Sequence, residues 1–198
     1  MAGFAQNEGS CLGINERISQ LAEPYLHTRR GLIHVPIVKD FADTLMQSEL
    51  ADPEIVIPAV LLHDVGWSAL TEEMQLKAYG PTYDISLNRI HEVEGVKIAR
   101  KLLHEAGYNN REKTEQIIEI IDGHDSRSTA LSNSDMVVKD ADKLYRFTQE
   151  GFSHLIGEFG VDAPFLSNHL GSEIDNWFFT PTAKKIASSE LAKRKKDW

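Results

Sequence analysis

Apolar residues recur along most of this chain at intervals of three or four positions, which is the period of an amphipathic helix. The stretches from Ile14 to His27 and from Ile33 to Leu50 show this spacing, and Ile90 to Ala106 continues it up to Gly107. No stretch alternates apolar and polar residues in the way that a half-buried strand does. The pattern therefore predicts an all-α fold.

One predicted helix has a clear beginning and an unusual end. Asp52 can cap a helix, and Pro53 suits the first helical position. The apolar run that follows leads directly to the doublet His63-Asp64 and then to Gly66. Pro58 predicts a kink or a later start, because proline removes a helical hydrogen bond. Further helices are expected over Arg111–Asp122, in one or two pieces between Met136 and Phe159, and from Thr182 onwards.

Two segments lie between the predicted helices. Ser68 to Asn88 contains Gly80-Pro81 and predicts an irregular connection of the kind that often covers a site. Val161 to Thr180 is rich in Gly, Pro, Asn and aromatic residues, and we expect it to wrap over the surface.

The length of 198 residues and the 41% hydrophobic content predict one domain with one core. We expect a flexible N-terminal segment over 1–13 and a helical domain over 14–160. We expect 161–198, with its basic final helix, to pack on that same domain.

The composition of the chain indicates the cellular compartment in which we expect the protein. Cys11 is the single cysteine, so the chain cannot form an internal disulfide. The N-terminus lacks a basic segment followed by an apolar one, and no apolar stretch approaches the roughly 18 residues of a membrane span. These features predict a cytoplasmic protein that does not contact a membrane.

Charge is distributed unevenly along the chain. Residues 181–198 carry a net charge of +4 against −9 overall, so the remainder carries −13. An acidic body repels the phosphate backbone, which excludes long nucleic acids as ligands, whereas a bound cation would partly neutralise it. A homodimer is compatible with this size, but no feature of the sequence requires one.

Six residues stand out as candidate metal ligands. Imidazole and carboxylate groups suit first-row transition metals. A His and an Asp delivered together by an apolar run need a polar partner, and a metal ion is one. The candidates are His34, His63, Asp64, His91, His124 and Asp142.

The order of these residues resembles the HD superfamily of metal-dependent phosphohydrolases, which is named after its His-Asp doublet. The likeness rests on His34, on His63-Asp64 and on the string Ala141-Asp142-Lys143-Leu144. Val38 and Ala42, which follow the first His at helical spacing, add to it. It covers roughly Leu26 to Phe147 and implies a single-domain helical bundle of the HD-domain type.

The resemblance also implies roles for the six ligands. His34, His63, Asp64 and Asp142 would hold one ion, and Asp64 would bridge to a second ion held by His91 and His124. The cofactors would be one or two divalent ions, chosen from Mn, Fe, Co, Ni and Zn, with Mg as a further choice.

The implied activity is hydrolysis of a phosphoester, in a nucleotide or another small phosphorylated metabolite. Two neighbouring ions can activate a water and clamp phosphoryl oxygens. Asp64 and His63 would be catalytic through the ions that they hold. Three basic residues near the ligands in sequence, Arg30, Arg127 and Lys143, are candidates to bind the substrate phosphate.

Several assignments stay open at this point. His27 lies seven residues before His34 and would share its helix face, and Asp140 projects nearer the apolar face than Asp142 does. Glu92 and Asp125 adjoin proposed ligands and are candidates to orient the imidazoles. Two aromatic residues, Trp67 and Tyr83, either pack in the interior or stack on a nucleotide base.

Two other functions fit the same ligands. A di-iron oxygenase of the HD type would use a similar set, since imidazole and carboxylate also bind iron. A non-catalytic domain would hold a metal or a small ligand as a sensor, with tight binding and no turnover.

Overall fold

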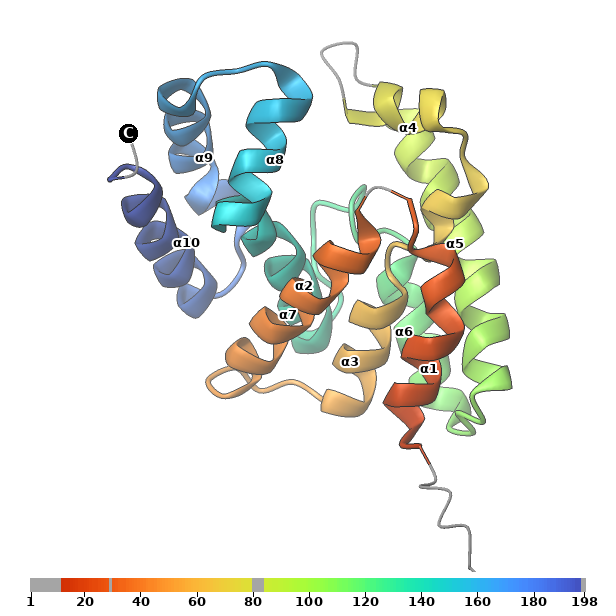
Figure 1. The fold of residues 1–198 in the computed structure, drawn as a ribbon. Helices are drawn as coiled ribbons and strands as arrows, with labels where there is room; N and C mark the ends of the chain where they lie inside the picture. The colour runs from red at the N-terminus through yellow and green to blue at the C-terminus, as the bar shows by residue number, and fades with distance from the viewer. Residues whose placement is uncertain (1–11, 29, 80–83, 197–198) are drawn as a thin grey trace, which may run out of the picture.

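The computed structural model describes residues 12–28, 30–79 and 84–196, and these parts of the chain form an all-α fold (Figure 1). They contain ten α-helices and no strands. The predicted fold class is thereby confirmed, while most of the predicted flexible segment 1–13 lies outside the described residues. The helices are α1 (Ile14–Ala22), α2 (Gly31–Met46), α3 (Pro53–Leu62), α4 (Glu72–Tyr79), α5 (Ile85–Glu105), α6 (Arg111–Ile121), α7 (Asn133–Leu144), α8 (Gln149–Phe159), α9 (Ala163–Trp177) and α10 (Pro181–Arg194).

Helix α3 forms the centre of the core. Every residue from Ile55 to Leu62 is buried, and α1, α2, α6 and α7 all contact this helix. The Asp52 carboxylate accepts a hydrogen bond from the Glu54 backbone N–H, which is the expected N-cap. The helix includes Pro58 and keeps its expected start, so the prediction of a later start was wrong. As a result, α3 delivers the doublet that follows it into the interior.

A short 3₁₀ helix, η2 (Val65–Ala69), continues from the doublet and packs tightly against α5. A Cβ atom on Gly66 would lie 1.9 Å from the His91 carbonyl oxygen and 2.5 Å from the Gly95 nitrogen. A larger residue at position 66 therefore could not keep α5 at this distance. The glycine that ends the apolar run brings His91 next to the doublet.

The predicted irregular connection contains a helix, so that prediction was wrong for Glu72–Tyr79. Helix α4 packs through Met74 and Ala78, which are four residues apart, in a small cluster with Trp67, Leu70 and Leu87. A helix of eight residues has too few turns to show a clear period in sequence. Tyr83 lies outside the described residues.

The segment expected to wrap over the surface is largely helical. Asp162 caps α9 by accepting a hydrogen bond from the Phe165 N–H, and the buried residues Leu166 and Leu170 lie one turn apart. The cap and this short apolar ridge outweigh the Gly- and Asn-rich composition. Helices α8, α9 and α10 lie together on one side of the bundle, next to α7 (Figure 1).

Among the described residues, no single helix has both the length and the apolar character needed to cross a membrane. Pro53–Ala69 and Glu72–Ala78 pass that test when taken together, but they are bent by 119° relative to each other.

Candidate metal centre

The six candidate ligands meet in two groups of three. His34 from α2, His63 at the end of α3 and Asp142 from α7 form the first group, which we call group 1. Group 2 contains Asp64, which follows His63, His91 from α5 and His124, which follows α6. In each group the ligand atoms lie within 4.8 Å of one another, which suits a shared metal ion.

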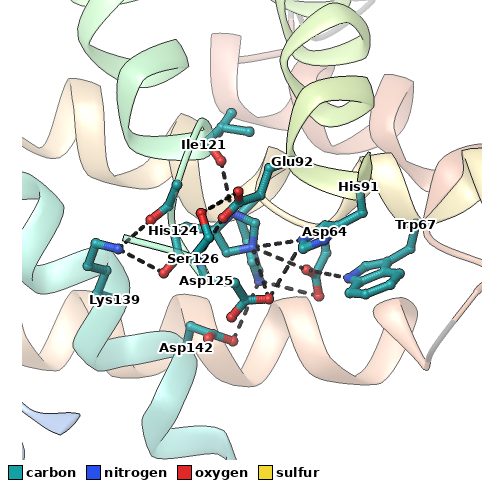
Figure 2. A network of polar contacts seen from close by, with 12 residues as sticks. Asp64, Trp67, His91, Glu92, Ile121, His124, Asp125, Ser126, Lys139 and Asp142 are labelled. Atoms are coloured by element: carbon teal, nitrogen blue, oxygen red, sulfur yellow. Dashed lines mark hydrogen bonds and ion pairs between the residues drawn. The ribbon is translucent and has the colours of Figure 1, made fainter. Parts of the chain in front are cut away.

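Asp64 connects the two groups, because each of its oxygens faces a different one. Its Oδ2 atom lies 3.4 Å from Nε2 of both His34 and His63. Its Oδ1 atom lies 3.7 Å from Nε2 of His124 and accepts a hydrogen bond of 3.0 Å from the Trp67 indole. Figure 2 shows this carboxylate between the imidazoles and the indole ring. A carboxylate in this position can serve two ions at once.

Backbone contacts orient two of the imidazoles. His63 Nδ1 lies 2.7 Å from the Val60 carbonyl oxygen, and His124 Nδ1 lies 3.0 Å from the Ile121 carbonyl oxygen. A carbonyl only accepts, so each Nδ1 donates, and Nε2 of each ring is the atom that faces the centre.

These Nε2 atoms come close to the Nε2 atoms of other imidazoles. The Nε2 atoms of His34 and His63 are 3.1 Å apart, and those of His91 and His124 are 3.3 Å apart. A metal ion beside each pair would take both nitrogens as ligands, because imidazole binds a metal through a nitrogen that carries no proton. The donor set therefore fits a metal ion in each group.

The charges of the site also favour a cation. Burial alone would raise the pKa of Asp64, but the charge of His63 and hydrogen bonds from His124 and His63 hold it well below its usual range. For Asp142, Arg146 and His34 overcome burial in the same way and lower the pKa. Both carboxylates are thus ionised in the interior.

The histidines respond in opposite ways. Burial lowers the pKa of His63, but Asp64 and Asp142 more than offset this and raise it to about 9. Burial and the charge of His124 lower the pKa of His91 to about 4, so His91 is neutral at physiological pH. Its ring stacks on Trp67, with 3.9 Å between the ring centroids. His91 is therefore ready to act as a ligand without releasing a proton.

The loop that carries His124 is held by two buried charged residues. The Lys139 ammonium donates to the carbonyl oxygens of Gly123 (2.6 Å), His124 (2.8 Å) and Arg127 (3.0 Å). Glu92 accepts hydrogen bonds from the backbone N–H groups of the next two residues, Asp125 and Ser126. Burial lowers the pKa of Lys139 to about 8, which reflects how completely this side chain is enclosed. Glu92 thus supports the loop rather than contacting an imidazole.

Asp125 points into the centre itself. Its Oδ2 atom lies 3.7 Å from His91 Nε2 and 3.8 Å from His124 Nε2, about as far as Asp64 is from His124. Its pKa is lowered, because His124 and His91 offset the effect of burial. Asp125 is therefore placed to act as a further ligand of group 2 or to accept a proton there. Its position directly after His124 was the signal in the sequence.

The two alternative ligands lie elsewhere. His27 is exposed, whereas His34 is buried and faces the doublet. Asp140 accepts hydrogen bonds from the Phe179 and Thr180 backbone N–H groups and from the Thr180 hydroxyl, so it anchors the segment before α10.

The three basic residues chosen for substrate binding do not line the cavity beside the ligands. Arg127 donates to the carbonyl oxygens of Glu119, Asp122 and Thr129 and to the Asp135 carboxylate. Arg30 pairs with Glu150 at 3.3 Å, and both side chains are well exposed. Lys143 lies on α7 next to Asp142, and a role for any of the three in substrate binding stays a prediction.

A cavity of about 60 Å³ opens beside group 1. Helix α8 and the 3₁₀ helix η3 (Tyr145–Phe147) form its outer wall. Sequence reasoning missed its one arginine, Arg146, although a residue four positions after Asp142 lies on the same face of a helix. The lining residues are His34, Asp64, Trp67, Asp125, Asp142, Tyr145, Arg146, His154, Leu155 and Glu158.

Comparison with known proteins identifies a family and a similar fold. The family model described as the HD domain matches residues 31–146, a span that contains all six candidate ligands. The fold is similar to a crystal structure of a predicted HD superfamily hydrolase from an uncultured Thermotogales bacterium, with a TM-score of 0.59 and 19% sequence identity. That similarity covers 91% of this chain and 86% of the other. No match was found among curated proteins.

Proposed function

This chain belongs to the HD domain family, and from that membership and the site geometry we propose that it is a metal-dependent hydrolase of phosphoesters. The substrate would be a small phosphorylated metabolite or a nucleotide. The enzyme would hold two divalent ions, one in each ligand group.

The observation that carries this proposal is the position of Asp64. One oxygen faces His34 and His63, and the other faces His124. A site for a single ion needs no carboxylate that is shared in this way, whereas hydrolysis by two ions depends on holding them close together.

His34, His63 and Asp142 would hold one ion, His91 and His124 would hold the other, and Asp64 would bridge them. When bound, such ions lower the pKa of water so that it can attack phosphorus, and they neutralise charge on phosphoryl oxygens. The chain itself fixes the imidazoles through the Val60 and Ile121 carbonyls and keeps most of the ligand shell buried. The Asp125 carboxylate, at the edge of the cavity, is placed to take up a proton from the attacking water.

The test combines metal content with turnover. Protein purified without chelators or metal-binding tags should contain close to two ions per chain by elemental analysis. The same protein, supplied with Mn²⁺, should release phosphate from a panel of phosphomonoesters and nucleotides, and chelation should abolish this activity. A fully loaded protein that releases no phosphate from any panel member would contradict the proposal.

Two outcomes would point to the other functions. Bound iron together with substrate-dependent oxygen consumption would identify an oxygenase, because a hydrolase consumes no oxygen. Tight binding of a phosphorylated ligand without turnover would indicate a sensor. Each outcome is distinct from the phosphate release expected for a hydrolase.

A further inference from the structure

We propose that Tyr145 and Arg146 form an anion-binding subsite, which holds a terminal phosphoryl group of the substrate against the metal centre. This inference rests on the proposed hydrolase function and deepens it. It assigns substrate binding to the cavity wall instead of to Arg30, Arg127 or Lys143.

The first argument is an unsatisfied hydroxyl. Tyr145 lines the cavity and is only 7% exposed, yet its buried hydroxyl has no hydrogen-bond partner among the described residues. Its ring is fixed edge-on against the His34 imidazole, with 4.6 Å between centroids. A buried polar group without a partner is unfavourable, because it has lost its hydrogen bonds to water. An oxygen atom of a bound ligand would remove that cost.

The second argument is the position of Arg146. Its guanidinium lies 3.4 Å from Oδ2 of Asp142, the oxygen opposite the one that faces His34 at 3.1 Å. It also lies over the Trp177 ring, 5.9 Å from the centroid. The cation is therefore held between a ligand carboxylate and an aromatic face, next to group 1. A guanidinium presents several donors in one plane, which matches the oxygens of a phosphoryl group.

The third argument is the character of the remaining wall. His154 and Glu158, one turn apart on α8, lie 3.7 Å from each other at the cavity. The imidazole can offer an N–H to an anion, and Glu158 lies where it partly balances positive charge.

The size of the cavity limits what can enter. A volume of about 60 Å³ corresponds to roughly five water molecules, taking about 10–15 Å³ for each. This volume is sufficient for a phosphoryl group beside the ligands. The subsite therefore takes the terminal phosphoryl group of the substrate.

The experiment measures binding of inorganic phosphate to the Mn²⁺-loaded protein by isothermal titration calorimetry. Tyr145→Phe removes only the hydroxyl, and we expect phosphate to bind about 3- to 10-fold more weakly, as for one hydrogen bond. Tyr108→Phe is the matched control, because the Tyr108 hydroxyl donates to the Glu54 carbonyl away from the cavity. It should bind phosphate as the wild type does.

Arg146→Gln removes the charge, and we expect phosphate binding to weaken about 10- to 100-fold at unchanged metal content. Arg146→Lys should lie between this variant and the wild type. Arg100→Gln is the control, since Arg100 pairs with Glu115 on an exposed surface of α5 and α6.

Three results would overturn the subsite. Phosphate could bind to Tyr145→Phe and Arg146→Gln within twofold of wild type, or the controls could weaken binding equally. Loss of binding in proportion to lost metal would also count against it, because it would show that Arg146 acts only through Asp142.

The two proposals fail separately. If the wild type hydrolyses phosphoesters and both variants bind phosphate normally, the subsite is wrong and the hydrolase stands. If the wild type hydrolyses nothing while both variants lose phosphate binding, the subsite stands and the hydrolase is wrong.

Discussion

The two ligand groups differ in what lies behind them. Group 1 draws His34 and Asp142 from the interiors of helices, and its open side faces the cavity with Tyr145 and Arg146. Group 2 obtains His124 from a loop, and that loop is backed by the buried charges of Lys139 and Glu92. A ligand on a helix is positioned by packing, whereas a ligand on a loop needs hydrogen bonds to hold its backbone.

This difference suggests a division of roles. Group 1 lies where substrate can approach, and its neighbours are candidates to bind that substrate. Group 2 is enclosed by an indole ring, an ammonium and a carboxylate, which together fix its geometry. Substitutions behind group 2 should therefore act on metal binding, while substitutions on the cavity wall should act on substrate binding.

The largest effect is expected at Asp64, which connects the two groups. Asp64→Ala should remove both ions and lower kcat/KM by at least on the order of 10²–10³-fold, the loss typical of one missing electrostatic stabiliser. Elemental analysis and phosphate release, measured on the same preparation, would check this. A variant that keeps both ions would show that Asp64 does not bridge.

Removing one imidazole from either group tests whether each group holds an ion of its own. His34→Ala and His124→Ala should each contain about one ion per chain, because each loses a ligand of one group only. Helical circular dichroism should be unchanged, since neither residue belongs to the apolar core. Exposed His27 provides the control, and His27→Ala should keep two ions. Equal metal content in all three variants would refute the assignment of two groups.

The support of the loop should matter less than the ligands. Lys139→Met leaves the carbonyl oxygens of Gly123, His124 and Arg127 without their common donor, which should cost about 1–3 kcal/mol of unfolding free energy. Affinity for the ion of group 2 should fall roughly 10- to 100-fold, as is typical when a residue that orients a ligand is lost. Denaturant unfolding and metal titration measure the two effects. Exposed Lys97 is the control, and Lys97→Met should change neither quantity.

The smallest effect is expected at Trp67. Trp67→Phe keeps an aromatic ring against His91 but removes the N–H that Asp64 accepts. Metal affinity should fall by about tenfold, the lower end of the range for such partners. Competition with a chromophoric chelator would measure this change. Affinity equal to wild type would mean that packing alone orients Asp64.

Some features of the fold and of the metal site could be predicted from the sequence. The doublet was recognisable because an apolar run delivers it into the interior, and helical periodicity was enough to predict the all-α class. The choice between Asp140 and Asp142 was harder, because both project close to one helix face. The contacts show Asp140 bound to the segment before α10 and Asp142 next to His34. The roles of the six ligands remain predictions until metal is measured.

Proximity to a ligand in the sequence did not identify the basic residue that lines the cavity. Arg127 lies three residues after His124, yet its guanidinium donates to the Glu119 and Asp122 carbonyl oxygens at the end of α6. Arg146 lies on the same helical face as Asp142 and reaches the cavity instead. Helical geometry would have identified it, but loop geometry could not have excluded Arg127.

The sequence by itself determined the helical class, the interior position of His63-Asp64 and the family, because periodicity and a few ordered polar residues carry that information locally. Tertiary structure alone decided which oxygen of Asp64 faces each group of ligands. It also decided which basic side chain lies at the cavity. These features depend on how α2 and α7 pack against α3, how α5 packs against η2 and how α8 packs against η3. Contacts between residues so distant in sequence leave no local pattern.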